Sequence, residues 1–105
     1  EERAARNEVL FRQANEKISD KGEELEVAGE LPFLCECEEP TCMQILRLTQ
    51  EEYERARSSA RQFVLAPGHE TRDAQPIETT DRFTIVKKSG VSAEIAERAD
   101  PRSTA

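Results

Sequence analysis

Three cysteines within eight residues constrain this chain more than any other feature of its sequence. Cys35, Cys37 and Cys42 form a C-x-C-x4-C pattern among acidic residues and a proline. An odd number of crowded cysteines is a poor disulfide framework and is typical of a reducing compartment. Thiolates this close in sequence can converge on one metal ion, because each needs only a sulfur about 2.3 Å from a shared zinc.

Three cysteines leave a tetrahedral zinc site one ligand short, because structural zinc takes four. His69 is the only histidine of the chain, and it follows a Pro67-Gly68 turn between predicted strands. It is therefore the favoured fourth ligand. Glu70, or an acidic residue of segment 36–39, remains an alternative.

Other interpretations of the cysteines fit the sequence less well. Buried cysteines can act as small apolar residues. That suits Cys35 in a strand, but it does not suit Cys37 and Cys42 with their acidic and proline neighbours. Iron–sulfur clusters and Cu(I) also bind thiolates, usually through four cysteines or another spacing. The pattern predicts one Zn²⁺ per chain, bound by Cys35, Cys37, Cys42 and His69.

The predicted zinc site is structural. A closed set of four ligands leaves no open position for a reactive water. The H-x-E and P-C-x-x-C motifs of zinc-dependent cytidine deaminases are missing from the sequence.

The chain of 105 residues fits a single domain, and its 36% apolar content provides a thin core that a metal would help to stabilise. Its 15 basic and 22 acidic side chains give a net charge of −7. Such a domain repels phosphates, so neither nucleic acid nor an anionic membrane is an expected partner. No apolar run approaches the length of a membrane span or a signal-peptide core, and we expect a cytoplasmic protein.

The N-terminal segment predicts an entry helix over residues 1–22. Leu10, Ala14 and Ile18 recur at four-residue steps, and Val9 and Phe11 widen this apolar stripe. Gly22 predicts the helix end. Residues 23–30 predict a linker, and residues 31–99 the rest of the domain.

Residues 31–48 predict a β-hairpin with the cysteines at its tip. Its strands are expected over 31–37 and 43–48. Thr49 and Glu52 then form a capping box, which predicts a helix from there to about Ser59.

The C-terminal part predicts two strands and a helix. Strands are expected over 63–66 and 82–88, with a loop over 70–80. Ser92 is expected to cap a helix that runs to Ala99 and ends at Asp100-Pro101. The fold class predicted is α+β: an N-terminal helix, short antiparallel strands around the Cys3His site, and short helices between strands.

Three segments carry a resemblance to a known family: FLCEC at 33–37, TQEEYE at 49–54 and FVLAPGHE at 63–70. Over nearly its whole length the chain resembles a family of small, uncharacterised, mainly actinobacterial proteins. In that family the cysteine turn and the P-G-H-E segment occur together, which implies that Cys35, Cys37, Cys42 and His69 act as a set. The resemblance implies no activity, and segment 89–92 departs from the family's closing segment.

These observations favour a non-enzymatic zinc-binding module whose partner is another protein. A single histidine bound to metal leaves Ser–His or Cys–His catalysis without a base, and no small-molecule substrate is expected. The alternative is a redox- or metal-responsive zinc–thiolate switch, because oxidation of the thiolates would release the metal. A zinc-finger nucleic-acid binder is disfavoured by the charge.

Overall fold

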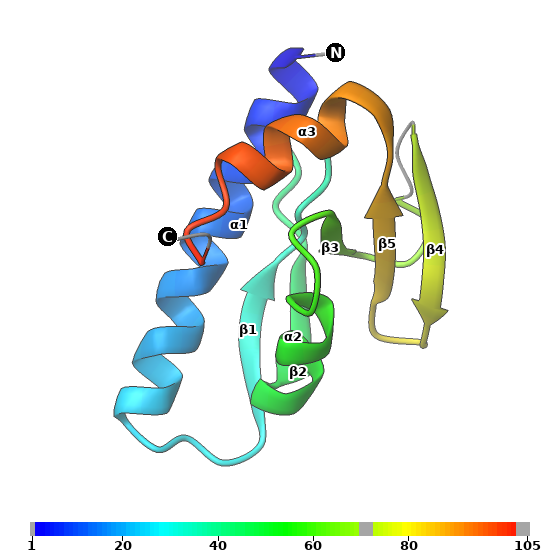
Figure 1. Cartoon of the computed structure of the whole chain (residues 1–105). Coiled ribbons are helices and arrows are strands. Elements are labelled where there is room, and N and C mark those ends of the chain that lie inside the picture. Colours follow the sequence, from blue (N-terminus) through cyan, green and yellow to red (C-terminus); the bar gives the residue numbers. More distant parts are fainter. Residues whose placement is uncertain (1, 70–72, 103–105) are drawn as a thin grey trace.

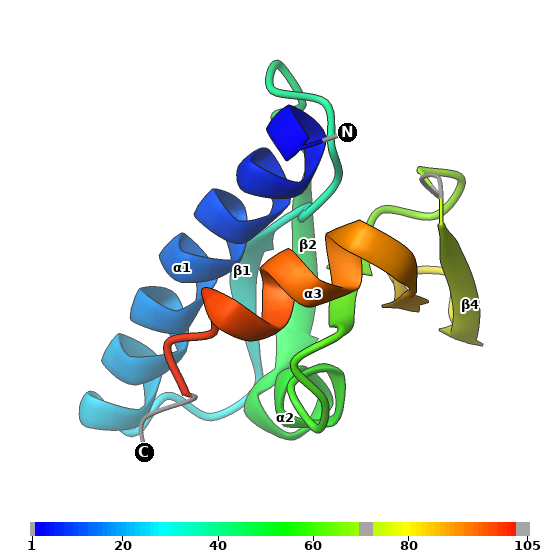
Figure 2. The ribbon, with the colours of Figure 1, turned by 45° about the horizontal axis from the view of Figure 1, so that its top comes forward.

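The computed structural model describes residues 2–69 and 73–102 and has the α+β architecture that the sequence predicts. Its elements in chain order are α1 (Glu2–Glu24), β1 (Glu30–Leu34), β2 (Ile45–Thr49), α2 (Gln50–Ala56), β3 (Gln62–Leu65), β4 (Ala74–Thr79), β5 (Thr84–Lys88) and α3 (Gly90–Arg98). Strands β1 and β2 form an antiparallel hairpin, and the second sheet has the antiparallel order β3-β5-β4. Helix α1 packs along β1, and α3 crosses α1 (Figures 1 and 2).

The hairpin provides one wall of the apolar core. The alternation of β1 and β2 places Phe33 opposite Leu46 and Leu31 opposite Leu48, with all four side chains buried. The Phe33 ring stacks on Tyr53 of α2, with 4.4 Å between ring centroids. The inward face therefore follows the period of two expected for strands.

Helix α1 buries a largely polar face, and the predicted apolar stripe faces inward only in part: Val9 is buried and Ile18 packs against the core. Leu10 is 61% exposed, whereas the residues that face inward are largely polar or small: Ala5, Glu8, Val9, Arg12, Asn15, Ser19 and Gly22. Arg12 donates to the carbonyls of Ala60 (2.6 Å) and Ala96 (2.7 Å), and it lies over the Phe63 ring. Polar groups can be buried here because acceptors on distant segments meet them.

The end of α1 also differs from the prediction. The helix passes through Gly22 and ends at Glu24. The amide of Val27 donates to Gly22 O (2.9 Å) and that of Glu26 to Glu23 O (3.1 Å), and Glu26 is left-handed with φ 53°. This is the hydrogen-bond pattern of a Schellman motif, with a glutamate where glycine is usual.

Gly22 has a packing role instead of a terminating one. A Cβ added there would lie 2.6 Å from Nε2 of Gln50 and 2.6 Å from Cδ1 of Leu31. The missing side chain therefore lets α1 approach the start of β1 and of α2 closely.

The loop predicted over 70–80 is wrong for its described part, because β4 occupies Ala74–Thr79. The strand is mostly exposed, and among the described strands it pairs only with β5. Its register shifts between Pro76 and Glu78. An edge strand needs little apolar patterning, and proline is tolerated there, so β4 leaves little sign in the sequence.

Two helix boundaries also differ from the prediction. Helix α3 begins at Gly90 after Ser89, three residues before the position expected from a Ser92 cap. The Ser92 hydroxyl instead donates to Ser89 O (3.1 Å) from within the first turn. Helix α2 ends at Ala56, where the Gln62 side chain donates to the Ala56 carbonyl (3.2 Å).

The capping box at the start of α2 is confirmed. Thr49 Oγ1 accepts from the Glu52 amide (3.1 Å), and the Glu52 carboxylate accepts from the Thr49 amide (2.8 Å). The Arg82 guanidinium lies on the same carboxylate and holds the pKa of Glu52 down to about 2.

We predict that Thr49→Ala lowers the free energy of unfolding by about 1 kcal/mol, because one amide at the helix start loses its acceptor. Urea unfolding at pH 7 measures the change. Thr49→Ser keeps the hydroxyl and is the matched control; an equal loss in both variants would contradict the capping role.

Candidate metal centre

The cysteines lie on the connection between β1 and β2. The ladder continues one step beyond β1, since the Cys35 amide donates to Gln44 O (3.2 Å). The chain then turns, and the Cys42 amide donates to Glu39 O (3.1 Å). The hairpin tip thus brings the first and last cysteine of the pattern to the same place, as the sequence predicts.

His69 reaches this tip from the end of β3. The His69 amide donates to Ala66 O (3.0 Å), and Gly68 between them has φ +85°. Proline followed by a glycine of positive φ is the signature of a type II turn. The Pro67-Gly68 turn therefore directs the imidazole back over the strand end.

The four predicted ligands come together. One ligand atom from each of Cys35, Cys37, Cys42 and His69 lies within 4.8 Å of all the others. Nδ1 of His69 is 3.6 Å from Sγ of Cys35 and 3.7 Å from Sγ of Cys42.

These distances fit one tetrahedral ion. Zn–S bonds of about 2.3 Å and a Zn–N bond of about 2.0 Å at tetrahedral angles put sulfur and nitrogen about 3.5 Å apart. The same bonds put two sulfurs about 3.8 Å apart, so shifts of about 1 Å or less would complete the set. Nδ1 is the imidazole nitrogen that would bind.

Burial sets the protonation of the thiols. It raises the pKa of Cys35, a shift that an amide on its sulfur opposes and the neighbouring sulfurs reinforce. Burial likewise raises the pKa of Cys37. Without a cation these two thiols are neutral, so a metal ion would displace their protons on binding.

One sulfur already has a hydrogen-bond donor. The Ala66 amide at the end of β3 donates to Sγ of Cys35 (3.1 Å). In C-x2-C turns the donor amides come from the turn itself; here the donor is the residue that follows β3.

Of the carboxylates proposed as alternatives to His69, those of Glu36 and Glu39 accept hydrogen bonds from other groups. Glu36 is fully buried and accepts from Asn15 Nδ2 (2.7 Å) and the Val64 amide (2.9 Å), away from the sulfurs. Its burial raises its pKa to about 7, although both hydrogen bonds lower it. Glu39 accepts from the Thr41 hydroxyl (2.9 Å). Glu70 is outside the described residues.

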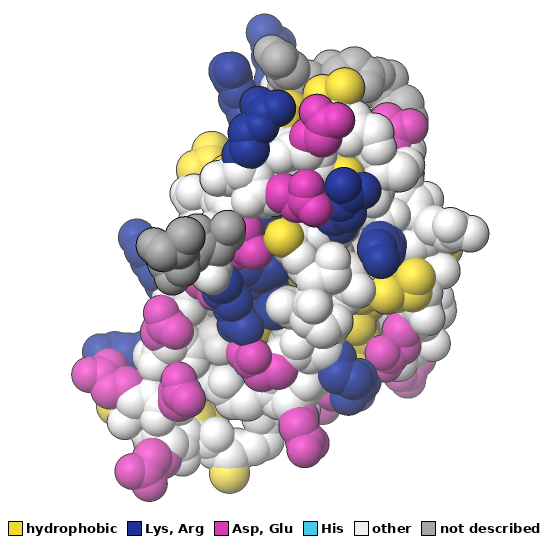
Figure 3. Space-filling view, in the orientation of Figure 1, with side chains coloured by type: hydrophobic (Ala, Val, Ile, Leu, Met, Phe, Trp, Pro, Cys, Tyr) yellow, Lys and Arg dark blue, Asp and Glu magenta, His cyan; other side chains and the backbone are white. Residues whose placement is uncertain are grey.

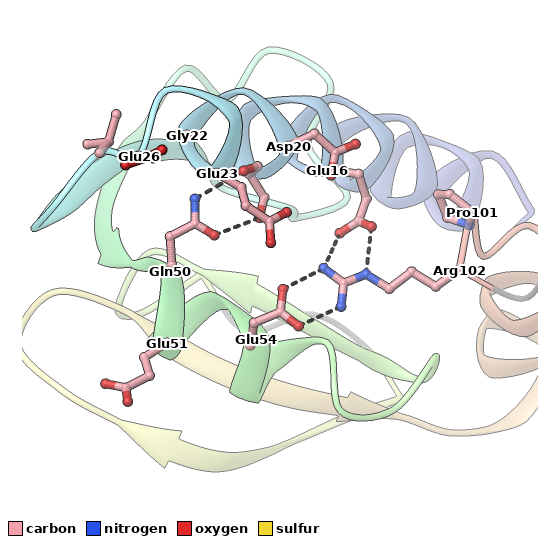
Figure 4. A pocket seen from close by; sticks show the side chains of 12 residues that line it. Glu16, Asp20, Gly22, Glu23, Glu26, Gln50, Glu51, Glu54, Pro101 and Arg102 are labelled. Carbon is pink, nitrogen blue, oxygen red and sulfur yellow. Dashed lines mark hydrogen bonds and ion pairs between the residues drawn. The ribbon is translucent and has the colours of Figure 1, made fainter.

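A second candidate site is an acidic hollow of about 810 Å³ between α1, α2 and the segment after α3 (Figure 4). Its lining includes six carboxylates: Glu16, Asp20, Glu23, Glu26, Glu51 and Glu54. Arg102 enters it and pairs with Glu16 (2.7 Å) and Glu54 (2.8 Å), which lowers the pKa of Glu54. The carboxylates of this hollow repel anionic ligands, and two of them are held in ion pairs.

Comparisons with protein-family models, with curated proteins and with solved structures found no match to this chain. Within residues 2–69 and 73–102, no helix combines the length and the apolar character needed to cross a membrane.

Proposed function

We propose that the chain is a small zinc-stabilised module that acts without catalysis, in a reducing cytoplasmic compartment, by binding another protein. The observation that carries this proposal is the convergence of three thiols and one imidazole nitrogen within 4.8 Å of one another. The ligands come from two separate segments, the hairpin tip and the end of β3. One ion would therefore tie the two sheets together.

Zinc is favoured by the ligand set. Three sulfurs and one imidazole belong to the structural zinc combinations, and zinc accepts the tetrahedral arrangement without preference from its d electrons. The cysteines carry no disulfide, which suits a reducing compartment.

A protein partner is supported by the outward face of the first half of α1. Leu10 is exposed beside a hollow of about 530 Å³ between α1 and α3, whose rim includes Arg6 and Arg98. In the view of Figure 3, several basic groups lie at the upper end of the molecule with a few carboxylates among them, and most of the carboxylates lie lower. A partner that presents an apolar side chain flanked by carboxylates would complement this rim.

A non-enzymatic role is supported by the assignment of all four side chains of the site to metal binding. The only histidine would be a metal ligand, and four protein ligands leave no position for a substrate. The net charge of −7 argues against nucleic acid.

The zinc assignment is tested by metal content and by His69→Ala. We expect one zinc per purified chain by elemental mass spectrometry. His69→Ala should retain three thiolate ligands and lose more than about 100-fold in zinc affinity, measured by chelator competition, because removal of even a group around the ligands commonly costs about 10- to 100-fold.

Glu39→Ala is the matched control, because Glu39 lies in the cysteine loop between β1 and β2 and its carboxylate accepts from Thr41. Its zinc affinity should equal that of the wild type. An unchanged affinity in His69→Ala, or a loss in Glu39→Ala, would transfer the fourth position to a carboxylate.

A redox switch is the second candidate, and the partial exposure of Cys42 favours it. Hydrogen peroxide would take two electrons from the thiolates of Cys42 and a neighbouring cysteine, forming one disulfide and, with two protons, two waters. Zinc released by stoichiometric peroxide and rebound after thiol reduction would support the switch. Resistance to peroxide would leave the purely structural role.

A further inference from the structure

The residue between the first two predicted ligands lies in a buried polar network that reaches α1. The Glu36 amide donates to Val64 O (2.8 Å), while its carboxylate accepts from the Val64 amide (2.9 Å). Glu36 therefore hydrogen-bonds both the backbone carbonyl and the backbone amide of Val64, the first through its own amide and the second through its carboxylate. The middle position of the C-x-C sequence is fixed to β3 at two points.

Asn15 supplies the second half of the network from α1. Its Nδ2 donates to the other Glu36 carboxylate oxygen (2.7 Å) and to Leu34 O (2.8 Å). Its Oδ1 accepts from the Leu34 amide (2.8 Å). The side-chain amide of Asn15 therefore hydrogen-bonds both backbone groups of Leu34, the last residue of β1, as the backbone of a neighbouring strand would.

Both side chains are fully buried, so water does not compete for these hydrogen bonds. The network fixes the residue before Cys35 and the residue after it. The amide of Ala66, the residue after β3, donates to the Cys35 sulfur. The backbone path from Leu34 to Cys37 has little freedom left.

We propose that Asn15 and Glu36 are positioning residues for the metal centre: they hold the C-x-C segment in the conformation that aims its two thiols at the ion. The inference rests on the proposed zinc site. It gives α1, which supplies none of the four ligands, an indirect part in metal binding through Asn15. Groups around metal ligands that set their orientation commonly change metal affinity 10- to 100-fold when removed.

The test compares Asn15→Leu with Tyr53→Phe, using Co²⁺ as a spectroscopic substitute for zinc. Tyr53→Phe removes the hydroxyl that donates to Glu16 (2.7 Å), another contact between α1 and the body of the protein, without touching the cysteine loop. Because metal binding is linked to folding, any destabilised variant loses some apparent affinity. Tyr53→Phe measures this general loss.

We expect Asn15→Leu to bind Co²⁺ about 10- to 100-fold more weakly than the wild type. The ratio of its loss of Co²⁺ affinity to its loss of unfolding free energy should be larger than the same ratio in Tyr53→Phe. Its thiolate-to-cobalt absorption bands should also change in position or intensity, whereas Tyr53→Phe should keep the wild-type spectrum. The proposal would be overturned if the two variants lost Co²⁺ affinity in the same proportion to their loss of unfolding free energy and gave identical cobalt spectra.

Glu36→Gln gives a second test if Asn15→Leu fails to fold. The amide keeps the shape of the carboxylate but can satisfy only one of the donors from Asn15 and Val64, so a smaller change in the same direction is expected. A wild-type protein that binds neither zinc nor cobalt would defeat the zinc site itself. Normal binding by wild type, Asn15→Leu and Glu36→Gln would defeat only the positioning role.

Discussion

Chelation of the metal is expected to lower the melting temperature of this protein by more than about 20 °C, or to unfold it at room temperature. Structural zinc contributes about 10–16 kcal/mol of apparent binding energy in zinc-finger peptides. A loss of even 4 kcal/mol lowers the melting temperature of a domain this size by about 16–32 °C. Circular dichroism melts with and without chelator measure the effect, and added zinc should restore the fold.

Cys37→Ser should reproduce this loss at a single position. A serine hydroxyl is a poor replacement for a thiolate ligand, and the site would retain three good ligands at most. Met43→Ser is the matched control in the same loop, because Met43 is 81% exposed and next to Cys42. A metal-free wild type that melts at the temperature of the zinc-bound form would refute the structural role.

Lys88→Met is expected to cost about 3–5 kcal/mol in the free energy of unfolding, for a reason independent of the metal. Nζ of Lys88 on β5 lies 2.6 Å from the carboxylate of Glu8 on α1, and both side chains are 2% exposed. Removal of the ammonium would leave a buried carboxylate without this counterion. Urea unfolding of the zinc-loaded protein at pH 7 measures the cost.

The double variant Glu8→Leu, Lys88→Met separates the two contributions to that cost. Replacement of a whole buried ion pair by apolar side chains is often neutral, because the desolvation of both charges is relieved. The double variant should therefore recover most of the stability lost in Lys88→Met. A double variant no more stable than Lys88→Met would mean that loss of the ion pair itself, and not burial of the Glu8 carboxylate without Lys88, accounts for the lower stability.

Removal of the metal and replacement of Lys88 test two different connections between the sheets and helices. The metal would join the hairpin tip to the end of β3, and the Glu8–Lys88 pair joins α1 to β5. Together with the Arg12 guanidinium on the Ala60 and Ala96 carbonyls, these contacts supplement a core with few aromatic residues. Small domains commonly need such additions.

Features encoded by neighbouring residues could be predicted from the sequence. The hairpin follows from the alternation in β1 and β2, and the Thr49–Glu52 capping box is a three-residue spacing. The convergence of the four candidate ligands could be predicted for the same reason: three lie within eight residues, and His69 follows a turn that proline and glycine specify locally.

The tertiary structure alone decided which face of α1 is buried. The spacing of Leu10, Ala14 and Ile18 predicted an apolar face, but the inward face carries Arg12 and Asn15. Their partners are the carbonyls of Ala60 and Ala96 and the polar groups of residues 34 and 36, which lie 19 to 84 positions away. Hydropathy measures the cost of burying a polar group, whereas the hydrogen bonds that offset this cost exist only once distant segments meet.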